Sequence, residues 1–212
     1  TLLHFRPSYT AALGRAVRGL GHDLSDEASA EAVARARRVA GEGPDAAHLG
    51  ANIAWWRAFF EAFASEVSGP KPAELAEGLW LQHRAGDWLE PAADTRATLD
   101  RLRAAGHRLG VISNWDDTLE PILERHGLLD AFEVVLASTA VGAAKPDSRI
   151  FLAALDAVRV APHEALHVGD EPVADVAGAR GVGIRPVLIG SASSDTDQIE
   201  TLAGLVRLLG GG

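Results

Sequence analysis

The chain has 212 residues, of which 20 are Lys or Arg and 29 are Asp or Glu, so its formal net charge is −9 at pH 7. This acidic balance disfavours a general binder of nucleic acid or of anionic membranes, because both need a basic surface. No run of about 18 apolar residues occurs, so the sequence predicts no membrane-spanning helix. The chain contains no Cys, which excludes disulfides, thiolate metal sites and a Cys nucleophile, and we expect a cytoplasmic protein.

The first 90 residues or so show no credible strand, and from Pro7 to about His83 the pattern predicts helices throughout. Pro7 is suited to an early helical position, and Ser25 is predicted to be the N-cap of a second helix that ends near Ala40. A third helix is predicted over about 47–67, and a fourth passes through Leu75 and the residues that follow it. This part of the chain therefore reads as a helical domain.

The third predicted helix carries a cluster of aromatic residues. Trp55, Phe59 and Phe63 recur at four-residue spacing, with Trp56 and Phe60 on the neighbouring stripe. Aromatic residues at helical spacing are usually buried, so we interpret them as core packing. Two adjacent Trp side chains cannot both point squarely at one core, so one of them is a candidate for a substrate-facing surface.

From about residue 87 the pattern changes to short apolar runs that alternate with amphipathic helices. The runs predicted as strands cover 109–113, 132–136, 165–168 and 184–189. The helices predicted between and after them cover 92–105, 118–126, 148–158, 173–179 and 196–209, and 191–197 is read as a polar loop. This alternation predicts a parallel sheet covered on both faces, with the ligand site beyond the carboxyl ends of its strands.

Polar residues follow the first of these strands, at Ser113, Asn114, Trp115 and Asp116. A Ser hydroxyl and a backbone N–H at a strand end can together bind one phosphoryl oxygen. A turn in which Ser and Asn cap the next helix accounts for the same residues. The motif alone leaves both interpretations open.

A single lysine, Lys145, follows the second strand in a loop that contains Gly142 and Pro146. A Lys in an apolar loop of this kind is suited to neutralising the charge of a phosphate or a carboxylate. A solvated loop Lys ahead of the next helix is an equally good interpretation.

Three carboxylates follow the third strand, at Asp170, Glu171 and Asp175, directly after Gly169. Hard oxygen ligands at this density suit Mg²⁺. Acids at the N-terminus of the next helix would complement its dipole, which accounts for Glu171 better than for an Asp at the end of a buried strand.

The segment from His163 to His167 matches the pattern H-E-x-x-H, in which two His on one helix face bind zinc. Pro162 precedes the segment and His167 leads directly into a predicted strand, where residues are spaced about 3.3 Å apart. We therefore interpret the segment as a connection into the strand, with His167 partly buried, and keep a zinc hydrolase as a remote alternative.

The order of the three strand-end signals resembles motifs II, III and IV of the haloacid dehalogenase (HAD) superfamily. These signals are Ser113-Asn114, then Lys145-Pro146, then Gly169 through Asp175. Within the superfamily the chain is similar to the C1-capped, phosphatase-like branch that includes the haloacid dehalogenase-like hydrolase domain-containing protein 3 group.

The resemblance implies an α/β fold in which a Rossmann-like parallel sheet core carries an inserted all-helical C1 cap. It implies that residues 1–5 are a remnant of core motif I, that residues 6–86 form the cap and that residues 87–212 form the core.

The resemblance also implies an activity, a cofactor and the residues that serve them. The activity is that of a Mg²⁺-dependent phosphatase that acts on a small phosphorylated metabolite through an aspartyl-phosphate intermediate. The catalytic residues it implies are Ser113, Asn114, Lys145 and Asp175. The substrate-binding residues are Ser113, Asn114, Trp115 and Lys145. For Mg²⁺ it implies Asp170 as a direct ligand and Asp175 either as a ligand through water or as the residue that orients Lys145, with Glu171 as a further candidate.

The chain begins at Thr1 and contains no Met. Thr1-Leu2-Leu3 looks like the tail of motif I, Asp-x-Asp-x-Thr, so we expect the nucleophilic Asp and the acid/base Asp to lie just upstream. A sheet without that central strand would expose two internal edges.

Besides the zinc hydrolase, two other functions stay open. A dehalogenase would keep the Asp nucleophile but need no metal, and the carboxylates of Gly169–Asp175 favour a phosphatase over it. A catalytically inactive HAD-like binding protein is the second alternative, since the nucleophile is missing. The expected partner is a small-molecule phosphate ester, not nucleic acid or a membrane, and we expect a monomer or a homodimer.

Overall fold

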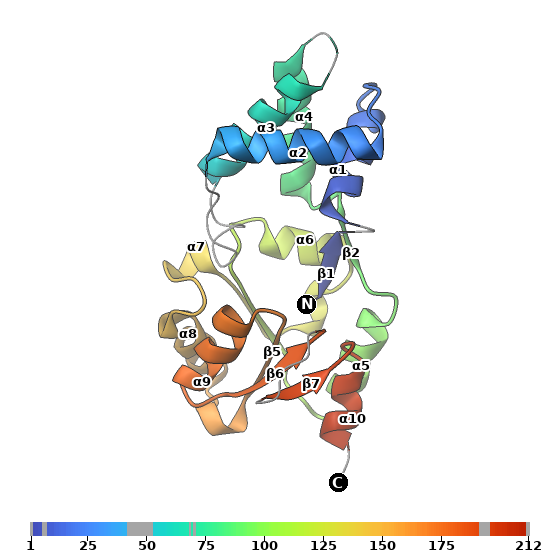
Figure 1. Cartoon of the computed structure of the whole chain (residues 1–212). Coiled ribbons are helices and arrows are strands. Elements are labelled where there is room, and N and C mark those ends of the chain that lie inside the picture. The colour runs from blue at the N-terminus through green and yellow to red at the C-terminus, as the bar shows by residue number, and fades with distance from the viewer. Residues whose placement is uncertain are drawn as a thin grey trace. The chain divides into compact units, whose positions relative to one another are not determined.

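The computed structural model describes residues 2–5, 8–41, 53–67, 69, 71–190 and 196–210, without the side chains of His4 and Phe5. The chain forms two compact units, Leu3–Glu90, here the helical unit, and Pro91–Gly212 with Leu2, here the sheet unit (Figure 1). None of the described helices is long and apolar enough to cross a membrane.

Four helices make up most of the helical unit: α1 (Tyr9–Gly19), α2 (Asp26–Ala40), α3 (Ile53–Glu66) and α4 (Pro72–Ala85). Ser8 and Ser25 are N-caps, because their hydroxyls accept hydrogen bonds from the backbone N–H groups of Ala11 and Ala28, each at 3.2 Å. The prediction for Ser25 is confirmed. The segment 47–52, predicted as the start of the third helix, lies largely outside the described residues.

The four helices pack in a ring in which α2 contacts α1 and α3, and α4 contacts α3 and α1. The aromatic residues of α3 fill its interior: Trp56, Phe59, Phe60 and Phe63 are buried. Trp55 is half-buried and stacks on Phe59, with ring centroids 5.4 Å apart. The interpretation of these residues as core packing is confirmed.

The prediction that the first part of the chain has no strand is wrong. The short strands β1 (Leu3–Phe5) and β2 (Leu89–Pro91) pair in a two-stranded sheet. In the sequence, β1 precedes the four helices and β2 follows them. Each strand has only three residues and its partner is distant in the chain, so no local periodicity reveals them.

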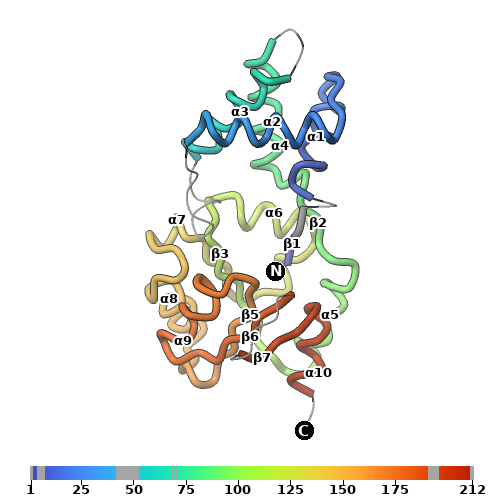
Figure 2. Tube along the Cα trace, in the orientation of Figure 1, coloured from blue at the N-terminus to red at the C-terminus, as the bar shows by residue number. Residues whose placement is uncertain are grey.

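The sheet unit alternates strands and helices, as its sequence pattern predicts (Figures 1 and 2). Its strands are β3 (Gly110–Ser113), β4 (Val134–Ala137), β5 (Leu166–Gly169), β6 (Arg185–Ile189) and β7 (Asp197–Ile199). Its helices are α5 (Thr95–Ala104), α6 (Leu119–Arg125), α7 (Ser138–Val141), α8 (Ser148–Val158), α9 (Gly178–Gly181) and α10 (Gly204–Gly210). Short 3₁₀ turns η2 (Leu129–Ala131) and η3 (Pro162–Glu164) and a π-helix, η4 (Pro172–Ala177), complete it.

Two of the predicted helices differ from the observed structure. The segment predicted as a helix over 173–179 is a π-helix, η4, followed by one turn of α9. The segment predicted as a helix from residue 196 first forms β7, which pairs with Val187–Ile189 of β6, and only then α10. The pairing with β6 is a tertiary contact that overrides the local helical pattern.

The parallel sheet is split between β3 and β5. β3 pairs with β4, β5 pairs with β6 and β6 with β7, all in parallel, while no pairing among the described residues joins β3 to β5. Residues of both strands are only half-buried, such as Ile112 and Val168, whereas Val187 of the flanked strand β6 is fully buried. The sheet therefore has two internal edges that carry no strand in the described part of the chain.

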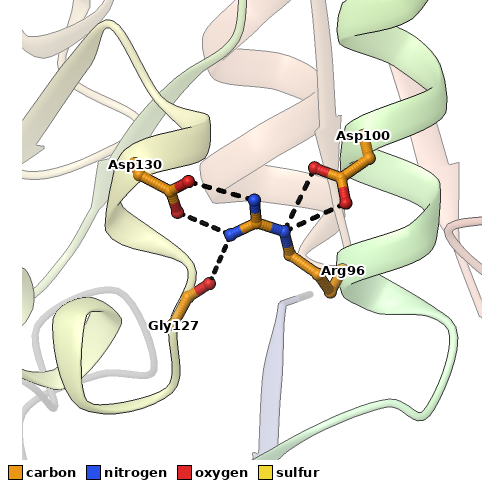
Figure 3. Close-up of polar contacts among 4 residues, drawn as sticks. All are labelled: Arg96, Asp100, Gly127 and Asp130. Atoms are coloured by element: carbon orange, nitrogen blue, oxygen red, sulfur yellow. Dashed lines mark hydrogen bonds and ion pairs between the residues drawn. The ribbon is translucent and has the colours of Figure 1, made fainter.

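Arg96 of α5 ties this helix to the turn before β4 (Figure 3). Its guanidinium donates to the carboxylates of Asp100 and Asp130 and to the carbonyl oxygen of Gly127, the last at 2.7 Å. The hydrogen bond from Arg96 holds the pKa of Asp130 below its usual range. The pairs are exposed, so we assign them a role in orienting α5 more than in stabilising the fold.

Candidate active site

The predicted site residues stand at the carboxyl ends of β3 and β5 and in the loop between α7 and α8. Ser113 is the last residue of β3 and Asn114 follows it, while Asp170 follows β5. Lys145 lies between α7 and α8, and Asp175 lies on η4, just after β5. These are the loops in which a parallel α/β sheet places its ligand site.

A buried ion pair links two of these residues. Lys145 Nζ donates to Asp175 Oδ1 at 2.6 Å, and the exposed fractions of the two side chains are 14% and 4%. His167 Nε2 lies 2.9 Å from the same oxygen, and the backbone N–H of Glu171 donates to Asp175 Oδ2 at 3.0 Å. Both carboxylate oxygens of Asp175 are thus held by polar neighbours.

These contacts decide the ionisation of Asp175. Burial raises the pKa of the carboxyl group, but the hydrogen bond with His167 and the charge of Lys145 outweigh it and hold the pKa of Asp175 well below its usual range. Asp175 is therefore ionised at neutral pH, and its charge holds the Lys145 ammonium group in place.

Gly169 makes room for this carboxylate. A Cβ atom added at Gly169 would overlap the carboxyl carbon of Asp175, so no larger residue fits without moving that side chain. His167 stands two residues earlier on β5, and residues two apart in a strand point to the same face. The space above Gly169 accommodates the carboxylate of Asp175, and the contact with the His167 ring fixes its position.

Replacing Gly169 by Ala is therefore expected to displace Asp175 and to lower the free energy of unfolding by about 1–3 kcal/mol, the usual cost of overpacking. Thermal denaturation measures this loss. Gly181→Ala is the matched control, because a Cβ there meets no atom within 4 Å and should leave the melting temperature nearly unchanged. A Gly169→Ala variant that melts with its parent would contradict this account of the site.

Asn114 contacts the same lysine from the other sheet. Its Oδ1 accepts a hydrogen bond from the backbone N–H of Lys145 at 2.7 Å, and its Nδ2 donates to the Lys145 carbonyl oxygen at 2.9 Å. The structure therefore brings Asn114, Lys145 and Asp175 into one chain of contacts. The hydroxyl of Ser113, half-buried next to Asn114, makes no hydrogen bond with another described residue.

The polar groups of Trp115 form hydrogen bonds with neighbouring protein residues. Its indole N–H donates to Thr118 Oγ1 at 2.9 Å, and its carbonyl oxygen accepts from the Ser138 hydroxyl at 3.1 Å. Asp116 is buried and its Oδ1 accepts from the backbone N–H of Thr118 at 2.9 Å. The loop after β3 is thus held by its own hydrogen bonds and by α7.

A family model described as haloacid dehalogenase-like hydrolase matches residues 1–183. The chain belongs to this family. The haloacid dehalogenase-like hydrolase domain-containing protein 3 of Bos taurus is 36% identical over 140 residues, which cover 64% of this chain and 55% of that protein. The ribulose-1,5-bisphosphate 5-phosphatase of Halopiger xanaduensis is 32% identical over 195 residues, or 90% of this chain and 79% of that protein.

A solved structure supports the same assignment. The HAD phosphatase from Thermococcus onnurineus is 29% identical, with a TM-score of 0.64, and the match covers 100% of this chain and 94% of that one. The α/β HAD fold and the hydrolase class expected from the sequence are confirmed. The match spans about half the length of the bovine relative.

The residues of this haloacid dehalogenase-like hydrolase fit a hard cation only in part. Asp170 and Glu171 are exposed carboxylates at the end of β5, whereas both oxygens of Asp175 are engaged by protein groups. Within the described ranges no group of three His, Cys, Asp or Glu side chains is arranged to hold a metal ion. The zinc alternative is not supported, since His163 lies in η3 and His167 in β5 and not on one helix face.

His167 is the site residue that the sequence motifs do not identify. It appears in the sequence only as part of the H-E-x-x-H match, yet it contacts Asp175 and packs edge-on against Phe151, with ring centroids 5.2 Å apart. The signal that could have found it is strand alternation, which places His167 on the face of Gly169.

Proposed function

We propose that this haloacid dehalogenase-like hydrolase is a phosphatase that acts on a small phosphorylated metabolite through an aspartyl-phosphate intermediate. The observation that carries the proposal is the buried Lys145–Asp175 pair at 2.6 Å, next to the strand end that bears Ser113 and Asn114. A cation fixed in a poorly solvated site stabilises a phosphoryl group far better than a solvated lysine does. The phosphatase from Halopiger xanaduensis, similar over most of the chain, supports the same class of reaction.

Three site residues of this chain have a proposed role in that reaction. Ser113 donates its hydroxyl proton in a hydrogen bond to a phosphoryl oxygen, and Lys145 offsets the negative charge of the phosphoryl group and of the attacking carboxylate. Asp175 holds the Lys145 ammonium group. The attacking carboxylate, which is not Asp175, forms a bond to phosphorus while the P–O bond of the ester breaks, and the leaving oxygen takes a proton from the acid/base Asp expected upstream. That Asp then takes a proton from water, which attacks the phosphorus of the acyl phosphate and releases inorganic phosphate and the free carboxylate.

We propose that the attacking carboxylate lies on a strand that is not among these 212 residues and that pairs between β3 and β5. The split sheet supports this, because β3 and β5 each offer an edge that carries no strand among the described residues. A parallel strand there would end beside Ser113 and Asp170, where the ligand site of such a sheet lies. The helical unit is proposed to be the inserted cap.

The proposed cofactor is Mg²⁺, and Asp170 is the ligand that this chain would contribute, with Glu171 as the second candidate. Carboxylate oxygens are the ligands that Mg²⁺ prefers, and Asp170 is exposed at the carboxyl end of β5. When bound, Mg²⁺ offsets the repulsion between a phosphate ester and an attacking carboxylate.

The test is phosphate release from p-nitrophenyl phosphate and from a broad panel of phosphate esters, by the protein that includes the segment preceding Thr1. We expect turnover with Mg²⁺ and its loss with EDTA. Release of halide from 2-chloropropionate without metal would replace the proposal by a dehalogenase. No turnover of any ester by a protein that carries Asp-x-Asp upstream would refute it, and a segment without Asp-x-Asp would favour a binding protein.

A further inference from the structure

Both polar atoms of the Asn114 side chain form hydrogen bonds with the backbone of one residue, Lys145. Lys145 N–H donates to its Oδ1 at 2.7 Å, and its Nδ2 donates to Lys145 O at 2.9 Å, across a separation of 31 residues in sequence. The oxygen and the nitrogen of a carboxamide are fixed relative to one another, so two such bonds set both the position and the rotation of the lysine backbone. A single hydrogen bond would leave that rotation open.

The position of this backbone decides where the ammonium group lies. Lys145 Nζ contacts Asp175 Oδ1 at 2.6 Å, and both side chains are largely enclosed. Displacing one member of such a pair leaves the other charge buried and uncompensated, which is costly. Asp175 is itself held by His167 and by the backbone N–H of Glu171, so it cannot readily follow a displaced lysine.

The contacts form one polar chain that runs from β3 to β5. Asn114 follows β3, Lys145 lies in the loop before α8, Asp175 lies on η4 and His167 on β5. Within the described residues no strand pairing connects these two strands. The polar chain therefore links the two half-sheets at the end where the site is located.

We propose that Asn114 is a positioning residue for Lys145: its carboxamide clamps the lysine backbone, and it acts on the reaction through that lysine. In this proposal the side chain of Asn114 is not a substrate ligand. The effect on phosphate turnover rests on the function proposed above, whereas the effect on the Lys145 ammonium group does not.

The chain offers an unusually clean test, because it contains only two lysines, Lys71 and Lys145. Lys71 is exposed and pairs with Glu74 on the surface, so its ammonium protons exchange quickly with water. The enclosed ammonium group of Lys145 exchanges slowly. With ¹⁵Nζ-labelled lysine, NMR spectra of the full-length protein should show one slowly exchanging ammonium signal that persists in Lys71→Arg.

Asn114→Ala and Asn114→Asp should shift this signal and speed its exchange at least severalfold. Asn114→Asp keeps the shape of the side chain and one acceptor, and removes the donor to Lys145 O. Thr139→Val is the matched control, because Thr139 bonds to the Trp115 carbonyl oxygen in the same region and not to Lys145. Both Asn114 variants are checked by circular dichroism and melting temperature.

An unchanged Lys145 signal in a folded Asn114 variant would overturn the proposal. Unfolding of both variants would also overturn it, because the carboxamide would then serve the fold and not the lysine. Where phosphate esters are turned over, Asn114→Asp should lower kcat about tenfold with little change in KM, and should add nothing in a Lys145→Met background. A raised KM or an additive loss would instead mark Asn114 as a substrate ligand.

Discussion

Replacement of Lys145 by Met is expected to lower kcat/KM for phosphate esters by about a thousandfold, as the loss of one preorganised charge at a reacting group typically does. Met keeps the length and the apolar stem of the side chain and removes the ammonium group. The Lys145 ammonium group is enclosed and held at 2.6 Å from Asp175. Water therefore cannot replace it in stabilising the charge of the phosphoryl group. Steady-state kinetics with p-nitrophenyl phosphate measures the effect.

The other lysine provides the control. Lys71→Met removes an exposed ammonium group that pairs with Glu74 in the helical unit, so kcat/KM should stay within twofold of the parent value. Equal losses in the two variants would mean that the reaction responds to net charge and not to Lys145.

A second variant separates chemistry from folding. Lys145→Met leaves the Asp175 carboxylate buried without its cation, which can lower the free energy of unfolding by itself. Lys145→Met combined with Asp175→Asn removes both charges, so the melting temperature should recover while the activity does not. Recovery of activity in the double variant would contradict the electrostatic role.

Local chemistry is what the sequence reveals best in this chain. The start of α2 at Ser25 and the bounds of α8 could be predicted because N-caps and helical periodicity act within one or two turns. The strand ends that carry Ser113 and Gly169 could be predicted because each buried strand is a continuous apolar run followed by polar residues.

Contacts between distant segments could not be read in the same way. The double hydrogen bond of Asn114 to Lys145 and the contact of His167 with Asp175 depend on how loops from different strands meet. β7 pairs with Val187–Ile189 of β6, whereas the local sequence pattern predicts a helix from residue 196. The motifs identified most of the site residues in the sequence. Which of these residues contact one another could be learned only from the folded structure.

A buried histidine in the helical unit makes the second large effect predictable, a loss of stability in mild acid. The ring of His83 packs among Trp56, Phe60, Trp80 and Trp88, with ring centroids 4.4 Å to 6.2 Å away. Burial in this aromatic cluster, with a smaller contribution from the charge of Arg84, lowers the pKa of His83 from 6.5 to about 4. The folded protein thus keeps this imidazole neutral where the unfolded chain protonates it.

The sign of the pH effect follows from this difference. Between about pH 6.5 and pH 4 the unfolded state binds one proton more than the folded state at His83, so acid favours unfolding. The stability is fully present above this window and is lost progressively as the pH falls through it. The loss is about 2 kcal/mol from pH 7 to pH 5, and about 3 kcal/mol over the whole window.

Tryptophan fluorescence during urea unfolding at a series of pH values measures this loss, because four of the five Trp residues lie in the helical unit: Trp55, Trp56, Trp80 and Trp88. His83→Phe keeps an aromatic ring in the cluster and should abolish most of the pH dependence between pH 7 and pH 5. His22→Phe, at a half-buried position of the same unit, should keep the parent slope. His83→Phe has no imidazole at position 83 that could bind a proton. If this variant and its parent lose the same free energy of unfolding between pH 7 and pH 5, the acid sensitivity arises from another group.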